Sequence, residues 1–266
     1  MSTKRKPSCY KLSENSKKST ADFKIANRLS SVIYAVFKQL LNQSASRDQY
    51  RRLNKRIVKV MNSGPKDFLG QRKLYHGNVG WLKGFRLNTY TIWDNLIRFQ
   101  PTINVLPVDQ IIQIRIPAIR SIDLNVPVRA SKIALQFVCC EVDADVCEVK
   151  TYYSAPLMCC FEQGRVVNTA KKLNMHIPQI EGKVLLVLVL IRTYLWGDYD
   201  SELNIKADAY LSNDRKYYAS EVLESVYVKD GQVVEYVIEE TKRTRLMSGL
   251  ITQVDAEWED EENNIP

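Results

Sequence analysis

The strongest hydrophobic feature of the chain lies in its last third, at Lys183–Trp196 (KVLLVLVLIRTYLW). Eight apolar residues run without interruption from Val184 to Ile191. This run is too short for a membrane-spanning helix, which needs about 20 residues. Its mixture of β-branched residues and leucines is typical of a strand. Because both faces of such a strand are apolar, we expect it to lie at the centre of a β body with packing on both sides.

The front of the chain has the pattern of an amphipathic helix. Apolar residues recur at spacings of three and four from Leu29 to Leu41, which predicts one wide buried stripe. Ser19 and Asp22 have the form of a capping box, so the helix is expected to begin near Ser19. Polar residues 42–44 end the pattern. The stripe consists of Leu29, Val32, Ile33, Val36, Phe37, Leu40 and Leu41.

A second helix is predicted from Ser46, where Gln49 completes another capping box, to the Gly64-Pro65 stop. Its apolar stripe is narrower and consists of Tyr50, Leu53, Ile57 and Met61. Together the two helices are expected to form an αα-hairpin over residues 20–64.

The outer positions of this second helix are basic. Such a face can lie along the phosphates of nucleic acid, with contacts that are sensitive to salt and independent of sequence. A solvated face that keeps a short helix soluble explains the pattern equally simply, because no base-reading pattern accompanies it. The candidate residues for binding nucleic acid or an acidic partner are Arg47, Arg51, Arg52, Lys55, Arg56 and Lys59.

The pattern becomes β-like from Trp81 onward, after residues 65–80, which are expected to be a linker with His76 exposed. Strands are predicted at residues 82–88, 100–105, 110–119, 132–142, 146–153, 183–196, 204–211, 217–229, 232–239 and 250–258. Residues 164–174 are expected to be a loop that leads to a short strand ending at Pro178. The expected fold class is mainly β, a β-sandwich or barrel-like body preceded by an N-terminal αα-hairpin.

Charge is distributed unevenly around a formal net charge of +8. Residues 1–75 carry 18 Lys/Arg and 4 Asp/Glu, whereas residues 255–266 carry six acids and no base. Such polarity favours a polyanion partner, or contact between the basic arm of one copy and the acidic tail of another. The expected organisation is a disordered basic arm (1–19), a basic helical hairpin (20–64), a linker (65–80), a β body of one or two units (81–254) and an acidic tail (255–266).

The chain has six cysteines, and its first 20 residues contain no apolar signal-peptide core. We therefore expect reduced thiols and a cytoplasmic location. Two adjacent pairs, Cys139-Cys140 and Cys159-Cys160, do not have the spacing of zinc ligands. Adjacent strand residues point to opposite faces, so at most one cysteine of each pair is expected in the core.

Motifs for catalysis are not found in the sequence: it has no phosphate-binding loop, no nucleophile elbow and no zinc-protease motif. There are only two histidines, His76 and His176. Two acidic pairs, Asp143 with Asp145 and Asp198 with Asp200, fall in predicted turns, where Asp is favoured in any case. We therefore expect no catalytic residue, no cofactor and no metal ion.

Two short segments resemble an uncharacterised family of Bacteroidetes proteins, each about 250 residues long. Residues 81–88 (WLKGFRLN) are similar to that family's apolar-x-Gly-Phe-x-Phe-Asn step, and residues 114–119 (IRIPAI) are similar to its Ile-Pro-Ala-Phe. The resemblance covers roughly residues 20–230 and implies a basic helical front followed by a β-rich body. The family supplies no activity and no site residue.

The leading hypothesis for function is a non-catalytic structural protein that assembles with other subunits, as a homo- or hetero-oligomer. A phage-particle (virion) component or an intracellular scaffold, in the cytoplasm or in a particle assembled there, fits this description. The alternative is a nucleic-acid-binding module that uses the basic helix face. A hydrolase or metal enzyme with an unfamiliar site is the least favoured, and no membrane contact is expected.

Overall fold

The structure, a computed structural model, describes most of the chain up to residue 236. The described residues are 12–41, 47–127, 129–161, 167–196, 199–200, 205–206 and 209–236. Residues up to Val234 form one compact unit, and a second unit begins at Glu235. The expected linker at 65–80 therefore does not separate two units.

Helices come first along the chain and strands follow. The helices are α1 (Glu14–Leu41), α2 (Arg47–Asn62), η2 (Lys66–Phe68), η3 (Leu74–His76), η4 (Val79–Leu82), α3 (Trp93–Leu96), η5 (Ser121–Asp123) and η6 (Arg215–Tyr217). The strands are β1 (Thr102–Leu106), β2 (Ile111–Ile116), β3 (Ile119–Arg120), β4 (Ala130–Asp143), β5 (Glu148–Tyr153), β6 (Leu157–Cys160), β7 (Val167–Asn168), β8 (Lys171–His176), β9 (Val184–Leu195), β10 (Tyr199–Asp200), β11 (Ile205–Lys206), β12 (Tyr210–Leu211), β13 (Tyr218–Lys229) and β14 (Gln232–Val233).

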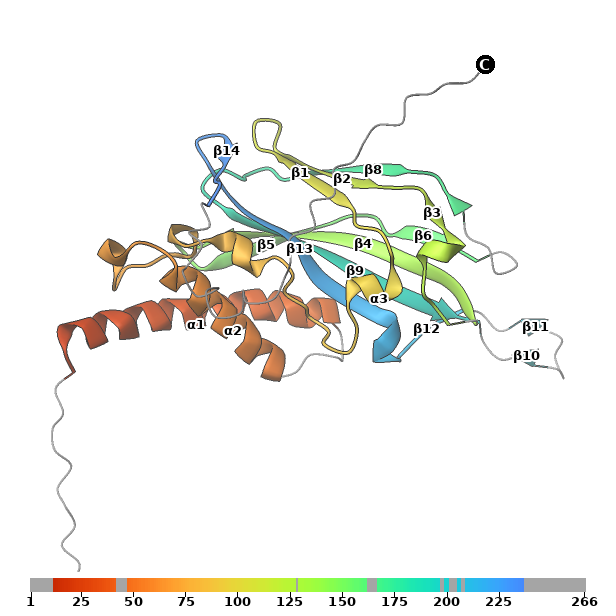
Figure 1. Ribbon diagram of the computed structural model, residues 1–266, viewed down its shortest axis with the longest axis horizontal. Coiled ribbons are helices and arrows are strands. Elements are labelled where there is room, and N and C mark those ends of the chain that lie inside the picture. Colours follow the sequence, from red (N-terminus) through yellow and green to blue (C-terminus); the bar gives the residue numbers. More distant parts are fainter. Residues whose placement is uncertain are drawn as a thin grey trace, which may run out of the picture. The chain divides into compact units, whose positions relative to one another are not determined.

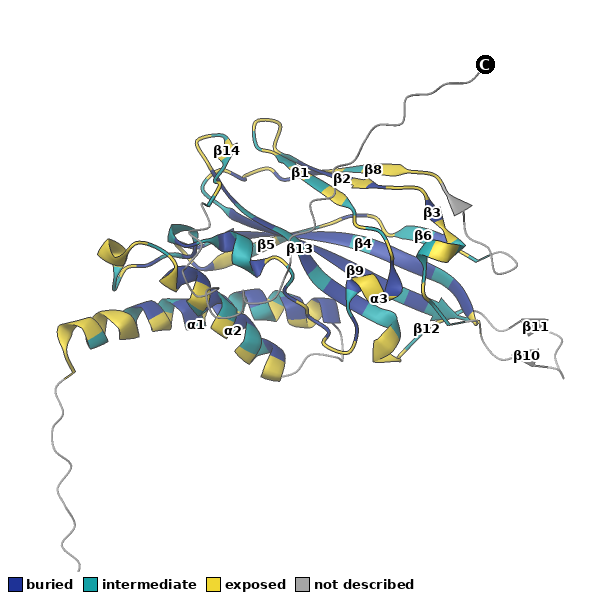
Figure 2. Ribbon diagram, in the orientation of Figure 1, coloured by how far each residue is buried: buried dark blue, intermediate teal, exposed yellow. Residues whose placement is uncertain are grey.

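The prediction of a central apolar strand is confirmed. Strand β9 lies in the middle of the larger sheet, in the order β14-β13-β9-β4-β5, with β6 and β12 also attached. Every residue from Val184 to Ile191 is buried, and β4 and β9 are buried along most of their length (Figure 2). The predicted mainly β class is confirmed, because strands dominate after the N-terminal helices. In the described residues the sheets are antiparallel and open, not closed into a barrel.

One face of the larger sheet packs against the smaller sheet, whose order is β1-β2-β8. Phe137 and Cys139 of β4 lie opposite Val189 and Val187 of β9. All four belong to one buried cluster that also contains apolar residues of the smaller sheet. The members from β2 and β8 are Ile112, Ile114, Ile116 and Met175.

The other face of the larger sheet is covered by the helices (Figure 1). Cys140 of β4 lies opposite Leu186 of β9, and both are buried. On this side the Tyr218 hydroxyl donates to the Leu40 carbonyl oxygen of α1 at 3.3 Å. The layer of helices on one face and the smaller sheet on the other explains why β9 is apolar on both faces.

Contacts between α1 and α2 are both polar and aromatic. The Ser30 hydroxyl donates to the Asn54 side-chain oxygen at 2.9 Å. The rings of Tyr34 and Tyr50 meet edge to face, with centroids 5.6 Å apart. These pairs advance along α1 as they go back along α2, so the two helices run in opposite directions where they touch.

Two hairpins join neighbouring strands of the β body, at the strands predicted for residues 132–142 and 146–153 and for residues 217–229 and 232–239. Strands β4 and β5 pair antiparallel on either side of the Asp143–Cys147 turn. Strand β13 pairs with β14 through Asp230 and Gly231, whose φ angles of 53° and 69° are those of a two-residue hairpin turn. Strand β13 also carries an irregularity in its pairing with β9, a register shift between Val222 and Glu224.

The predicted start of the first helix is wrong. Helix α1 begins at Glu14, and the Ser13 hydroxyl accepts a hydrogen bond from the Ser16 amide at 3.2 Å, as an N-cap residue does. Residues 14–19, expected to be disordered, are therefore helical. Asp22 does not cap the helix: it is buried and accepts hydrogen bonds from distant backbone amides, which no local pattern can reveal.

Residues 65–80 do not form a simple linker. They contain the 3-10 turns η2 and η3 and the start of η4, and they bury Leu74 and Val79 completely. His76 is half-buried and stacks on Phe68 with ring centroids 4.0 Å apart. The apolar residues of this segment follow no helix or strand period, because each packs separately against α2 or β13.

Three further assignments need correction. The expected loop at 164–174 contains β7 and most of β8, and Lys171–His176 pairs with β2 along its whole length. Asp200, expected in a turn, lies in strand β10. Both Cys139 and Cys140 are buried, because each face of β4 has its own covering layer.

Several predictions lie outside the described residues. These are the basic arm at residues 1–11, the chain after Tyr236 with its expected strand at 250–258 and acidic tail, and Asp198 of the second acidic pair.

Residues 82–88, predicted as a strand, form the end of η4 and a single bridge between Arg86 and Glu221.

Because β9 is buried on both faces, we expect substitutions on either face to lower the free energy of unfolding by a similar amount. Leu185→Ala and Leu186→Ala, which point to opposite faces, should each lower the free energy of unfolding by about 2–5 kcal/mol. Val108→Ala, at an 86% exposed position, should change it by less than about 0.5 kcal/mol. Urea unfolding followed by circular dichroism measures all three. A near-neutral result for either leucine would show that its face is not packed.

Candidate functional site

Helix α2 presents its predicted basic residues on two surfaces. Four of the six, Arg52, Lys55, Arg56 and Lys59, line one open groove of about 480 Å³. The remaining lining residues are Gly84, Phe85, Arg86 and Thr89. Arg47 and Arg51 are exposed on the same helix and do not line this groove.

Helical spacing explains why these four side chains meet. Arg52, Lys55, Arg56 and Lys59 are separated by three or four residues, so they share one face of α2. On the opposite face a row of apolar side chains is buried, which turns the cations outward. The buried residues are Leu53, Ile57, Val60 and Met61.

Two of the arginines also hold the second wall of the groove in place. Arg56 donates from Nε to the Trp81 carbonyl oxygen at 2.5 Å and from Nη2 to the Lys83 carbonyl oxygen at 3.0 Å. Arg52 donates from Nη1 to the Arg86 carbonyl oxygen at 3.0 Å. A carbonyl satisfies a donor but does not neutralise its charge. Both guanidinium groups therefore fix residues 81–86 and stay cationic.

The second wall is attached to the edge of the larger sheet. The Gly84 amide donates to the Val222 carbonyl oxygen at 2.8 Å, and the Val222 amide donates to the Phe85 carbonyl oxygen at 2.9 Å. Gly84 has a φ angle of +73°, which a residue with a side chain rarely adopts. The groove is therefore built between a helix and a rigid sheet edge.

Positive charge exceeds negative charge around the groove. Six cations are found on its two walls, counting Lys83, but in the described part of the chain only three carboxylates are ion-paired with them. Asp48 is 3.1 Å from Arg52, Glu224 is 2.8 Å from Lys83, and Glu221 is 3.9 Å from Arg86. The balance is +3.

The unpaired cations are on α2. Lys55 is exposed and has no ion-pair partner among the residues the structure describes. Lys59 lies over the Trp81 ring, with Nζ 4.7 Å from the centroid. The Nη2 donor of Arg52 is buried without a hydrogen-bond partner. Lys55 and Lys59 can therefore attract an anion to the groove, whereas the buried Arg52 Nη2 donor is not accessible to one.

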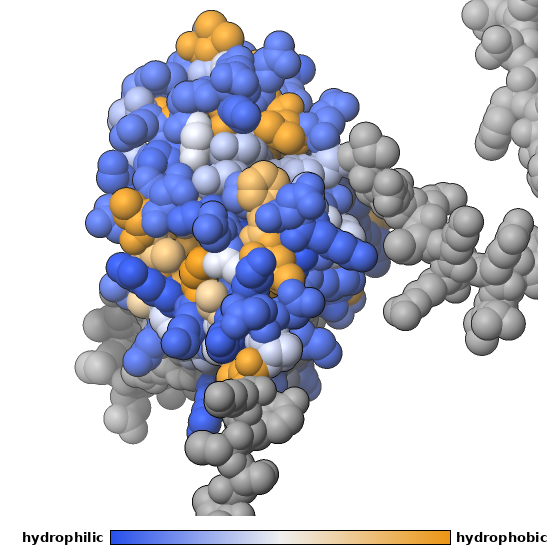
Figure 3. Space-filling view, turned by 90° about the vertical axis from the view of Figure 1, so that its left-hand side faces the viewer, coloured by the Kyte–Doolittle hydropathy of each residue, from blue (hydrophilic) through white to orange (hydrophobic). Residues whose placement is uncertain are grey.

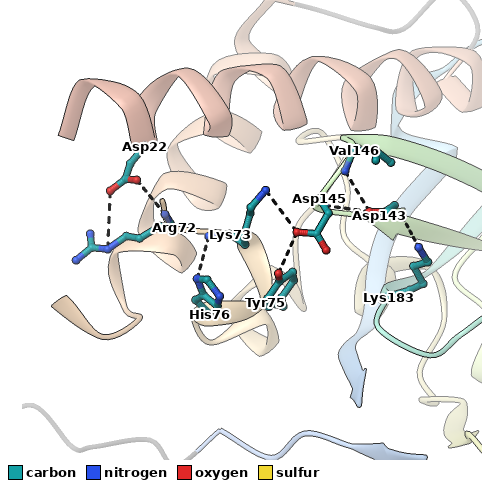
Figure 4. Close-up of polar contacts among 9 residues, drawn as sticks. All are labelled: Asp22, Arg72, Lys73, Tyr75, His76, Asp143, Asp145, Val146 and Lys183. Carbon is teal, nitrogen blue, oxygen red and sulfur yellow. Dashed lines mark hydrogen bonds and ion pairs between the residues drawn. The ribbon is translucent and has the colours of Figure 1, made fainter. Parts of the chain in front are cut away.

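A second polar cluster joins the β4–β5 turn to residues 72–76 (Figure 4). One carboxylate oxygen of Asp145 accepts from the Tyr75 hydroxyl at 3.0 Å and lies 3.4 Å from Lys73 Nζ. Burial, together with the hydrogen bond to Asp145, raises the pKa of Tyr75 to about 12. The phenol therefore stays protonated at neutral pH and acts as a donor to the turn.

Asp143 organises the turn itself, as the sequence predicted for an Asp at this place. One oxygen accepts from the amides of Asp145 (2.9 Å) and Val146 (3.2 Å), and the other from Lys183 Nζ. Burial acts to raise the pKa of Asp143, but the hydrogen bonds from Lys183 and the two amides outweigh it. The pKa of Asp143 lies below its ordinary value of 3.8.

The cysteines have surroundings typical of core packing. Burial raises the pKa of Cys140 to about 12 and that of Cys139 well above the usual range, which keeps both as thiols. Within the described part of the chain, no three His, Cys, Asp or Glu side chains lie together in a way that could hold a metal ion. None of the described helices combines the length and apolar character needed to cross a membrane.

Sequence reasoning found one wall of the groove and missed the other. Arg86 and Lys83 belong to the segment 81–88, which is predicted to contain a strand and resembles part of a family, but no site residue is assigned to it. The position of Arg86 between the apolar residues Phe85 and Leu87 was the available signal. What brings them to α2 is the long-range bonding of Arg52 and Arg56, which has no trace in the sequence.

The Asp143 contacts predict a pH-dependent loss of stability. Asp143→Asn should lower the free energy of unfolding at neutral pH by about 1–3 kcal/mol. A depressed pKa contributes stability above the unfolded value, and this is lost as the pH falls through the folded value. The difference between Asp143→Asn and the parent should therefore shrink below about pH 4.

Urea unfolding at about pH 7 and pH 3 measures this difference. Asp67→Asn, which removes an exposed carboxylate, serves as the control and should show little effect at either pH. A difference that stays constant with pH would contradict the assigned role of the carboxylate.

Comparison with known proteins adds no further constraint. No protein-family model matches the chain, and no curated protein matches it. The resemblance to the Bacteroidetes family stays a prediction, and function has to be argued from the geometry of this chain.

Proposed function

We propose that this protein binds nucleic acid, without catalysis, along the groove between α2 and residues 83–89. The carrying observation is the excess of positive charge on two walls that are held rigidly 
in place. Among the described residues Lys55 and Lys59 have no carboxylate partner, so their charges are available to phosphates.

The contacts in this proposal are with phosphates and not with bases. Arg52 and Arg56 already donate to backbone carbonyls, which leaves few of their donors for reading base edges. Phe85 is buried at the groove and offers no exposed ring for stacking. Binding is therefore independent of sequence and steeply dependent on salt.

A second candidate, assembly with other protein subunits, is favoured by unpaired sheet edges. In the described residues β5 pairs only with β4, and β1 and β8 each pair only with β2. Such edges can pair with another chain. The basic front and acidic end of the sequence support the same idea. A nucleic-acid-binding subunit of a particle or scaffold in the cytoplasm would combine both candidates.

Within this proposal the finer architecture is a β-sandwich of the two sheets with an αα-hairpin on its outer face. The hairpin supplies the groove and the sandwich supplies the rigid support. The surface at the end of the molecule where α1 begins is mostly hydrophilic, with hydrophobic side chains in separate patches (Figure 3). That surface favours charge over apolar burial as the source of binding there.

A pair of double charge reversals tests the nucleic-acid proposal. Lys55→Glu/Lys59→Glu changes the groove, and Arg47→Glu/Arg51→Glu makes the same change in net charge on the same helix outside it. The groove variant should bind a labelled duplex of about 20 base pairs at least tenfold more weakly, and its plot of log K against log salt should be less steep by about 2. The control should stay within about threefold of the parent.

Fluorescence anisotropy between about 50 and 200 mM salt measures both quantities. An equal loss of affinity in the two variants would show that binding depends on net charge and not on the groove. No loss of affinity in the groove variant would contradict the proposal. Thermal unfolding of each variant confirms that it is folded. Light scattering of the parent at low and high salt tests the second candidate. A strict monomer under all conditions would contradict self-assembly.

A further inference from the structure

A second cationic site lies away from α2, at the end of the smaller sheet. A pocket of about 400 Å³ opens where β1 begins, β2 ends and β8 begins. Three cations line it, Arg115, Lys171 and Lys172, and none of its lining residues is acidic. The remaining lining residues are Gln100, Thr102, Ile116, Pro117 and Ala170.

The arrangement of these charges is unfavourable in the absence of a ligand. Arg115 of β2 lies directly opposite Lys172 of β8 in the register of the sheet, and Lys171 is the next residue along β8. Like charges directly opposite in neighbouring strands destabilise the pair. Among the residues that the structure describes, no carboxylate is within ion-pair distance of any of the three. A bound anion would supply the missing negative charge.

Arg115 is held in position for such a contact. Its Nε donates to the Gln113 side-chain oxygen at 2.9 Å, and Gln113 is itself buried. This bond leaves the two terminal nitrogens of the guanidinium available as paired donors. A planar fork of this kind matches the oxygens of a phosphate group.

The chemistry of the walls restricts the ligand further. Ile116, Pro117 and Ala170 give the pocket an apolar side, and the Thr102 hydroxyl adds a polar group. The volume is within the range of small-molecule sites, about 300–1,000 Å³. Three cations without an acid favour a group with close to two negative charges, which a phosphate monoester carries at neutral pH.

We infer that this pocket binds a small organic phosphate. The phosphate lies between Arg115 and Lys172, which share one face of the smaller sheet, and the organic part lies against Pro117 and Ala170. This site is separate from the groove on α2, and it does not depend on the function proposed for that groove. Its ligand is a single phosphate ester and not a polymer.

Three probes distinguish binding of the phosphate group from binding of the organic group: phenyl phosphate, inorganic phosphate and phenol. Isothermal titration calorimetry of the parent should show phenyl phosphate binding more tightly than inorganic phosphate and phenol not binding. Inorganic phosphate binding as tightly as phenyl phosphate would overturn the assignment of an organic ligand. No binding of phenyl phosphate at millimolar concentration would overturn the site.

Two double variants locate the site. Arg115→Gln/Lys172→Met should weaken phenyl phosphate binding at least about tenfold, because it removes two charged donors. Lys55→Met/Lys59→Met removes the same charge from the groove and should leave this binding unchanged. Equal weakening in both variants, or none in the first, would contradict the assignment.

Stability provides a readout that a purely structural role would not produce. Lys172→Met relieves the like-charge contact, so the unliganded variant should unfold at the same temperature as the parent or higher. Phenyl phosphate should raise the unfolding temperature of the parent more than that of Lys172→Met. A lower unfolding temperature without ligand would show that Lys172 stabilises the fold, and would contradict the site.

Discussion

Burial of strand β9 on both faces is the constraint on which the rest of the structure depends. A strand with eight consecutive apolar residues cannot leave either side open to water without a large free-energy cost. The chain meets this requirement with two different layers, the smaller sheet on one face and the helices on the other. The two sets of β9 side chains therefore belong to separate cores. The order β13-β9-β4 keeps the most apolar strand farthest from the sheet edges.

The same constraint places the cationic groove. Because α2 buries Leu53 and Ile57 against the rest of the unit, its arginines and lysines face away from the core. Arg52 and Arg56 then bond to the backbone of residues 81–86, which is hydrogen-bonded to β13. The groove is thus a consequence of how the helical layer joins the edge of the sheet. Arg52 and Arg56 hold the two walls together, whereas Lys55 and Lys59 beside them have no carboxylate partner among the described residues.

Features with a local cause could be predicted from the sequence. The continuous apolar run of β9, the Asp-rich turn after β4 and the Asp230-Gly231 turn all follow from residue types over a few positions. Features that depend on distant partners could not. Asp22 resembled a cap but accepts from Gly70 and Arg72, and Cys140 is buried because helices cover its face of the sheet. For the groove, the α2 cations follow from helical spacing, but Arg86 reaches them only through tertiary bonds.

The central claim is that β9 is enclosed by both layers, and native-state hydrogen exchange at its amides tests this most directly. The account predicts that the amides from Leu185 to Ile191 exchange only through global unfolding, with the free energy obtained from denaturant unfolding. Exchange of these amides at a much lower free energy, while strands at the sheet edges stay protected, would contradict it. Such a result would mean that one covering layer detaches from the sheet, and the rigid wall assumed for the groove would be lost with it.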